Sequence, residues 1–202
     1  MTHNIAWHFT SDKLRDGTPI PAIGEKLVFN DDIEICRKGY HWSKEPFDAM
    51  KYAPGNTLHM VQYGGNIQEQ EDKGCSSERT ILKSIDAAYL LRRFAADQAL
   101  SVSHLWDMPD IVKAYLTTLD ETIRQAATAI AYRTAYYASA SYAASDAASS
   151  AYYASAYYAS ASYAYRAATY AAVAAYYDFR GAAARKEFNH RVYKAFEGFN
   201  NV

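Results

Sequence analysis

Hydrophobic and polar residues alternate in short runs along the first part of the chain, and turn residues separate the runs. This two-residue period, with its aromatic and β-branched residues, predicts β-strands. The predicted strands cover residues 5–9, 26–29, 33–36, 40–43, 57–63 and 79–85. The strand at 57–63 is predicted to end at Gly64-Gly65. Residues 45–52 have helical spacing instead, with Pro46 in the first turn and Ser43 as the cap.

A helical period replaces the alternation after residue 84. Apolar residues spaced by three and four predict helices at 85–99, 108–119 and 182–196. Ser84 and Asp107 are predicted to cap the first two of these helices, and Gly181 is predicted to separate the third from the chain before it.

Between residues 126 and 185 the composition is dominated by 26 Ala, 13 Tyr and 8 Ser, and Leu does not occur. Alanine is the best helix former, so this tract is predicted to be helical, with a break near residues 145–150 that gives two antiparallel helices. The alternative is a pentapeptide-like β-solenoid, because Ala-Tyr-Tyr-Ala-Ser recurs. Such coils favour Leu or Phe at their inward position, which argues for the helix.

These patterns predict an α+β protein in which a small mixed β-sheet domain precedes an Ala/Tyr-rich helical region. The predicted organisation is a mixed domain at 1–84, connecting helices at 85–119, a helical hairpin at 120–180 and a C-terminal amphipathic helix at 181–202.

Composition and charge exclude several classes of function. The formal net charge is -1, which argues against both a basic nucleic-acid clamp and an acidic DNA mimic. The chain has no apolar run of membrane-spanning length and no signal-peptide pattern at its beginning, and its two cysteines have no metal or redox spacing. We therefore expect a cytoplasmic protein without a membrane, metal or nucleic-acid partner.

Candidate functional residues lie in two places. In the N-terminal part, His8, His41 and Glu71 are candidate catalytic groups, although a single histidine is most often a structural residue. The candidate binding residues there are Tyr40, His41, Trp42, Ser43, Tyr52 and Arg79. In the Ala/Tyr tract the candidates are Tyr152, Tyr153, Tyr157 and Tyr158, because tyrosine gives a large contact area at low entropic cost. The same tract could instead be purely structural, and we expect it to form a homo-oligomer interface.

The segment from Trp7 to about Ile85 resembles an uncharacterised domain family of phage and bacterial proteins. The resemblance rests on an opening aromatic strand, on Cys36-Arg37-Lys38-Gly39-Tyr40-His41, and on Pro46-Phe47-Asp48-Ala49. It continues in a strand that ends in Gly64-Gly65 and in Asp72-Lys73, followed by Arg79 and Ile81. The repeats that follow this domain in the family are richer in Gly and Ser, so the resemblance implies nothing about the Ala/Tyr tract.

A weaker likeness is to the ADP-ribosyltransferase fold, in which an early histidine, an aromatic or serine-bearing strand and a late glutamate hold NAD. That likeness would give these parts to His8, to Tyr40 or Ser43 with Tyr52, and to Glu71.

The leading hypothesis is a non-enzymatic binding protein, encoded by a phage or prophage, that engages a bacterial host protein or a small nucleotide signal in counter-defence and needs no cofactor. The alternatives are an NAD-using ADP-ribosyltransferase-like enzyme and a structural assembly protein of a phage.

Overall fold

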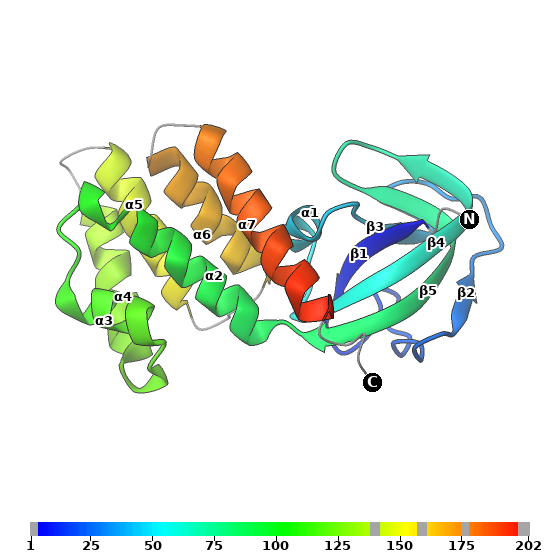
Figure 1. The fold of residues 1–202 in the computed structure, drawn as a ribbon, viewed down its shortest axis with the longest axis horizontal. Coiled ribbons are helices and arrows are strands. Elements are labelled where there is room, and N and C mark those ends of the chain that lie inside the picture. Colours follow the sequence, from blue (N-terminus) through cyan, green and yellow to red (C-terminus); the bar gives the residue numbers. More distant parts are fainter. Residues whose placement is uncertain (1–3, 138–141, 157–160, 175–177, 198–202) are drawn as a thin grey trace. The chain divides into compact units, whose positions relative to one another are not determined.

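The fold was analysed in a computed structural model that describes residues 4–137, 142–156, 161–174 and 178–197 (Figure 1). The strands are β1 (Ile5–Thr10), β2 (Lys26–Val28), β3 (Tyr40–Trp42), β4 (Thr57–Glu69) and β5 (Gly74–Asp86). The helices are α1 (Pro46–Lys51), α2 (Ala88–Ser101), α3 (Asp110–Thr118), α4 (Glu121–Tyr137), α5 (Tyr142–Ser155), α6 (Ala161–Ala174) and α7 (Asp178–Glu197), with a short 3₁₀ turn, η1 (Ser103–Leu105). The chain divides into two compact units, residues 1–87 with 191–202 and residues 88–190. The predicted α+β class is confirmed.

The first unit is built on a five-stranded antiparallel sheet in the order β1-β4-β5-β2, with β3 also paired to β5. Strands β4 and β5 form a long hairpin, drawn in cyan and green in Figure 1. The prediction that Gly64-Gly65 ends a strand is wrong, because the glycines lie at an irregularity in the pairing and β4 continues to Glu69. Such bulges bend a strand without ending it.

The predicted strand at 33–36 is also wrong. Residues 33–39 form a loop with a single bridge between Glu34 and Lys38. Cys36 has a φ of 70°, in the left-handed region, which is incompatible with an extended strand. The sequence alternates here, but the backbone turns so that the chain can enter β3.

Each face of the sheet carries its own core. On one face Ala6, Val61, Ile81 and Trp42 form a cluster, with each residue at most 2 % exposed. On the other side Trp7 packs against the C-terminal part of α7, with ring centroids 5.0 Å from Phe196 and 5.6 Å from Tyr193. The Lys83 ammonium donates to the Phe196 carbonyl at 3.5 Å, and the Tyr193 hydroxyl donates to Glu45 at 2.7 Å. The first unit is therefore completed by residues from the other end of the chain.

Gly74 lies where the Trp42 ring crosses β5. A Cβ at position 74 would enter this ring, at 2.7 Å from Cε2. We expect Gly74→Ala to lower the free energy of unfolding by about 1–3 kcal/mol, the usual cost of overpacking a core. Gly64→Ala is the matched control, because a Cβ there meets only the flexible Glu78 side chain, at 3.2 Å or more. Urea unfolding of both variants measures the difference, and equal costs would contradict this packing.

The second unit is helical, which confirms the helical prediction for the described part of the Ala/Tyr tract over the solenoid. The tract does not form the predicted hairpin of two helices, because α4, α5 and α6 all lie in it. The predicted break at 145–150 lies inside α5, and the predicted stop at Gly181 lies inside α7. One glycine costs a helix only about 1 kcal/mol, which flanking alanines offset.

The three predicted helix caps, Ser43, Ser84 and Asp107, are also wrong. Ser84 lies within β5, where its hydroxyl bonds to His59, and α2 begins only at Ala88. The N-cap position of α3 is Pro109 rather than Asp107, and α1 begins after Glu45 without a side-chain cap. Sequence spacing locates these helices to within a few residues. It does not show that Ser84 belongs to β5, which continues to Asp86.

Small residues bring the helices of the second unit close together. Ala99, Ala147, Ala151 and Ala167 are fully buried. The Ser150 hydroxyl donates to the Ala167 carbonyl of α6 at 2.8 Å, and the Thr128 hydroxyl donates to the Ser155 carbonyl of α5 at 2.6 Å. Serine and threonine hydroxyls, which are unfavourable inside an isolated helix, thus form hydrogen bonds between helices.

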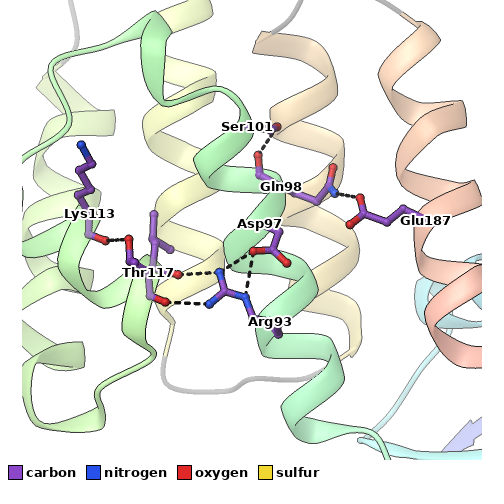
Figure 2. A network of polar contacts seen from close by, with 8 residues as sticks. Arg93, Asp97, Gln98, Ser101, Lys113, Thr117 and Glu187 are labelled. Atoms are coloured by element: carbon purple, nitrogen blue, oxygen red, sulfur yellow. Dashed lines mark hydrogen bonds and ion pairs between the residues drawn. The ribbon is translucent and has the colours of Figure 1, made fainter. Parts of the chain in front are cut away.

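A polar network joins α2 to α3 and α7 (Figure 2). The Arg93 guanidinium pairs with Asp97 at 2.6 Å and donates to the Leu116 and Thr117 carbonyls, at 2.8 and 3.1 Å. Gln98 donates to Glu187 of α7 at 3.0 Å. Arg93 therefore satisfies the last carbonyls of α3, where a cation also complements the helix dipole. None of the helices in the described ranges has the length and apolarity that a membrane crossing needs.

Candidate functional site

The candidate site is centred on Arg79 of β5, which pairs with Tyr63 of β4 and Leu27 of β2. Arg79 is only 3 % exposed. Its Nη1 donates to the His41 carbonyl at 3.0 Å, its guanidinium lies over the Tyr40 ring at 5.2 Å from the centroid, and its Nε is buried without a partner. It forms no ion pair with any carboxylate in the described part of the chain.

A buried guanidinium without a counter-charge is costly. Burial lowers the pKa of Arg79 to about 10, which leaves the side chain charged at neutral pH. Charges that are buried in proteins are normally paired, because desolvation costs several kcal/mol for each ion. A site that keeps such a charge is a candidate for binding an anion.

Three histidines surround Arg79 from three other strands: His8 on β1, His59 on β4 and His41 on β3. Burial, followed by the positive charge of Arg79, holds the pKa of His8 well below its ordinary value and lowers the pKa of His59 to about 4. Burial and then the charge of Arg15 lower the pKa of His41. All three rings are therefore uncharged at neutral pH, and Arg79 dominates the charge of the cluster.

The hydrogen bonds of two of the three histidines are complete. His59 lies between two hydroxyls, with Nε2 2.8 Å from Thr10 Oγ1 and Nδ1 2.7 Å from Ser84 Oγ. His41 Nε2 accepts from the Cys36 backbone N–H at 2.7 Å. These two rings are held in place by the fold.

His8 differs from both. It lies opposite His59 in the β1–β4 register, so the two rings share a face of the sheet. Like His41 it is partly exposed, but its ring forms no hydrogen bond with another described residue. His8 is therefore the histidine of the cluster that is available to a ligand.

Aromatic rings border the guanidinium. Tyr40 lies beneath it, and Trp42 stacks on Tyr63 with ring centroids 3.8 Å apart and an angle of 22° between their planes. The Trp42 indole N–H donates to Ser76 Oγ at 3.2 Å, which fixes the ring in the core. Tyr40 and Tyr63 are partly exposed, and burial raises the pKa of both.

The structure brings together several of the residues predicted to form a site. Arg79, Tyr40, His41 and His8 lie in one cluster, and Trp42 lies in the neighbouring core. Ser43 does not take part; it is buried and bridges to Trp7 through the backbone. His59 was missed, although the same alternation that gives the strand at 57–63 also places His59 on one face with Val61.

Glu71 and Tyr52 lie apart from this cluster. Glu71 is an exposed residue of the turn that joins β4 to β5, whereas His8 pairs near the other end of β4. The structure therefore does not bring His8 and Glu71 together. The Tyr52 hydroxyl donates to Asp72 at 2.6 Å, and Lys51 pairs with the same carboxylate at 2.9 Å, an arrangement that lowers the pKa of Asp72.

The tyrosines of the second unit form a chain of ring contacts across three helices. Tyr132 of α4 contacts Tyr152 of α5 at 5.4 Å, and Tyr153 stacks on Tyr170 of α6 at 5.2 Å. Arg166 donates to the Tyr153 hydroxyl at 3.3 Å. Tyr152 and Tyr153 are thus half-buried between helices, while Tyr132 and Tyr136 are exposed. The other two predicted residues, Tyr157 and Tyr158, lie outside the described residues.

Comparison with known families places the Arg79 cluster inside one domain. Within the described ranges, no group of three or more His, Cys, Asp or Glu side chains could hold a metal ion. No significant match was found among curated proteins or among solved structures. Residues 5–93, which contain all five strands and every residue of the Arg79 cluster, match the family described as a domain of unknown function, DUF7666.

Proposed function

We propose that the N-terminal domain is a non-enzymatic binding module for a small nucleotide, whose phosphate it holds at Arg79. The observation that carries this proposal is a charged guanidinium that is 3 % exposed and has no carboxylate partner in the described residues. A phosphate would supply the missing negative charge, and arginine suits it because its planar fork can donate two parallel hydrogen bonds.

The surroundings of Arg79 support a ligand with an aromatic part. Tyr40 is a partly exposed ring against the cation, and Tyr63, which is opposite Arg79 in the β4–β5 register, is also partly exposed and is held by its stack with Trp42. Nucleotide sites commonly combine a cation for the phosphate with an aromatic ring on which the base stacks. Of the two partners expected from the sequence, a host protein and a nucleotide, the nucleotide fits this arrangement.

The alternative of an NAD-using transferase depends on His8 and Glu71 acting together. His8 lies in β1 and Glu71 in the turn between β4 and β5, so the alternative loses its pair of reacting groups. The setting implied by the resemblance, a phage protein that acts in a bacterial host, stays a prediction, as does the homo-oligomer.

Removal of the charge should separate binding from stability. We expect Arg79→Met to weaken the binding of adenosine 5′-monophosphate by about 10- to 100-fold, because a charge-assisted hydrogen bond contributes about 1.5–3 kcal/mol. We expect the ligand-free variant to unfold at the same or a higher temperature than the wild type, because it no longer buries an unpaired charge. Calorimetric titration and thermal unfolding of the full chain measure the two effects.

Two controls make this test specific. Arg37→Met removes an exposed arginine of the same unit, paired with Glu34 at 3.1 Å, and should change neither quantity. Adenosine, which lacks the phosphate, should not bind detectably. If neither adenosine 5′-monophosphate nor inorganic phosphate binds, or if Arg79→Met binds them as the wild type does, the proposal is wrong.

A further inference from the structure

We propose that the Arg79 cluster selects a phosphate monoester over a phosphodiester, because it binds the doubly charged phosphate together with one proton taken up at His8. This inference rests on the proposed function and specifies its ligand class. The structural basis is the position of an uncharged histidine without a hydrogen bond on the same face of the sheet as a buried, unpaired guanidinium.

The first step concerns which group can respond to a ligand. His59 uses both ring nitrogens on Thr10 and Ser84, and His41 accepts from the Cys36 backbone. A proton added to His41 Nε2 would break its hydrogen bond with the Cys36 N–H, whereas His59 is 1 % exposed and both its nitrogens are held by hydroxyls, so a ligand does not reach its ring. His8 has no such constraint, so a proton can be added to its free ring nitrogen at no cost in hydrogen bonds.

The second step concerns the charges that face His8. From the strands these are Arg79 on β5, His59 on β4 and His41 on β3; Arg79 is charged and opposes a charge on His8, and each of the other two would do so only if it took up a proton. The α1 helix, which also contacts β1, carries Asp48 and Lys51. With Arg79 as the charged neighbour in the cluster, an imidazolium at His8 is repelled in the ligand-free protein.

The third step is the balance of charge once a ligand is bound. A phosphodiester carries one negative charge, which Arg79 alone neutralises, and His8 stays neutral. A phosphate monoester carries up to two negative charges at neutral pH, since its second pKa is about 6. The second charge reverses the field at His8 and favours uptake of a proton from solvent onto the ring. The cluster then holds two positive charges against two negative ones.

The selectivity follows from this balance. The monoester gains a second charge-assisted hydrogen bond that the diester cannot form with neutral His8. We expect adenosine 5′-monophosphate to bind the full chain at least 10-fold more tightly than 3′,5′-cyclic adenosine monophosphate at pH 7. The two probes share the base and the ribose and differ chiefly in whether the phosphate is a monoester or a diester.

Titration calorimetry in two buffers with different ionisation enthalpies counts the protons. We expect uptake approaching one proton with adenosine 5′-monophosphate, and uptake near zero with the cyclic probe. Because a phosphate can itself be protonated, sulfate serves as a third probe, since it is a dianion that takes up no proton near pH 7. Sulfate should shift the His8 Cε1–H resonance toward its imidazolium position while the His59 resonance stays in place.

His8→Asn should reduce the affinity for adenosine 5′-monophosphate to that for the cyclic probe and abolish proton uptake. His104→Asn, at an exposed histidine outside the first unit, is the control and should behave as the wild type. If both nucleotides bind equally, or if proton uptake persists in His8→Asn, this inference is wrong while the proposed function stands. If none of the three probes binds, both are wrong.

Discussion

Phe196→Ala is expected to lower the free energy of unfolding of the first unit by about 3–5 kcal/mol, the usual cost of removing a buried phenylalanine from a core. Phe196 is 5 % exposed and meets the Trp7 ring edge-on at 5.0 Å. Its removal leaves a cavity against Trp7 and weakens the end of α7. Urea unfolding followed by tryptophan fluorescence measures the loss.

Lys194→Ala is the matched control, because Lys194 is an exposed residue in the same last turn of α7. We expect its effect to stay within about 0.5 kcal/mol, as for most surface substitutions. A small effect of Phe196→Ala would mean that the C-terminal segment does not pack on Trp7. A large effect would mean that residues 5–93 form a stable domain only with a segment about a hundred residues further along the chain.

This dependence on a distant segment explains what sequence patterns could and could not predict. The period of Phe188, Val192 and Phe196 correctly gives an amphipathic helix, and all three residues are buried. The pattern identifies an apolar face but not what that face covers. In the structure Phe188 packs against Phe94 of α2, whereas Phe196, at the end of the same helix, packs against Trp7.

The candidate site shows the same limit. The alternation at 5–9 places His8 on the opposite face from Trp7, and the alternation at 57–63 gives a partner strand. The register that sets His8 opposite His59 is fixed by the pairing of β1 with β4, two strands far apart in the sequence, which a local pattern does not record. The separation of Glu71 from His8 has the same cause, because the sequence of a charged turn does not show at which end of a hairpin the turn lies.

Acidification is expected to destabilise the first unit well above the pH at which its carboxylates titrate. A histidine has a pKa of about 6.5 in the unfolded chain, whereas His59 has a pKa of about 4 in the folded protein. Below pH 6.5 the unfolded state therefore binds a proton that the folded state does not, and the free energy of unfolding falls with pH until about pH 4. For His59 alone the total loss is about 3 kcal/mol.

His8 and His41 add to this loss, because the pKa of each is also lowered in the folded protein. Carboxylates with hydrogen-bond partners do not obscure this contribution of the histidines to the pH dependence. Asp16 and Asp72 have pKa values below 3.8 in the folded state, so the stability that they contribute is lost only as the pH falls through the region below about 5. The interval from pH 6.5 to 5 thus reports mainly on the histidines.

His59→Gln tests the assignment, because glutamine does not titrate. This variant should be less stable than the wild type at pH 7.5, where the hydrogen bonds to Thr10 and Ser84 are weakened, but its stability should fall less steeply between pH 6.5 and 5. His104→Asn should keep the full pH dependence of the wild type. Urea unfolding at a series of pH values gives the slopes, and equal slopes for His59→Gln and the wild type would show that His59 is not the group buried without its proton. Burial and then the charge of Arg79 keep His8 and His59 neutral, so the pH dependence of the first unit reports on histidines that are packed around an unpaired guanidinium.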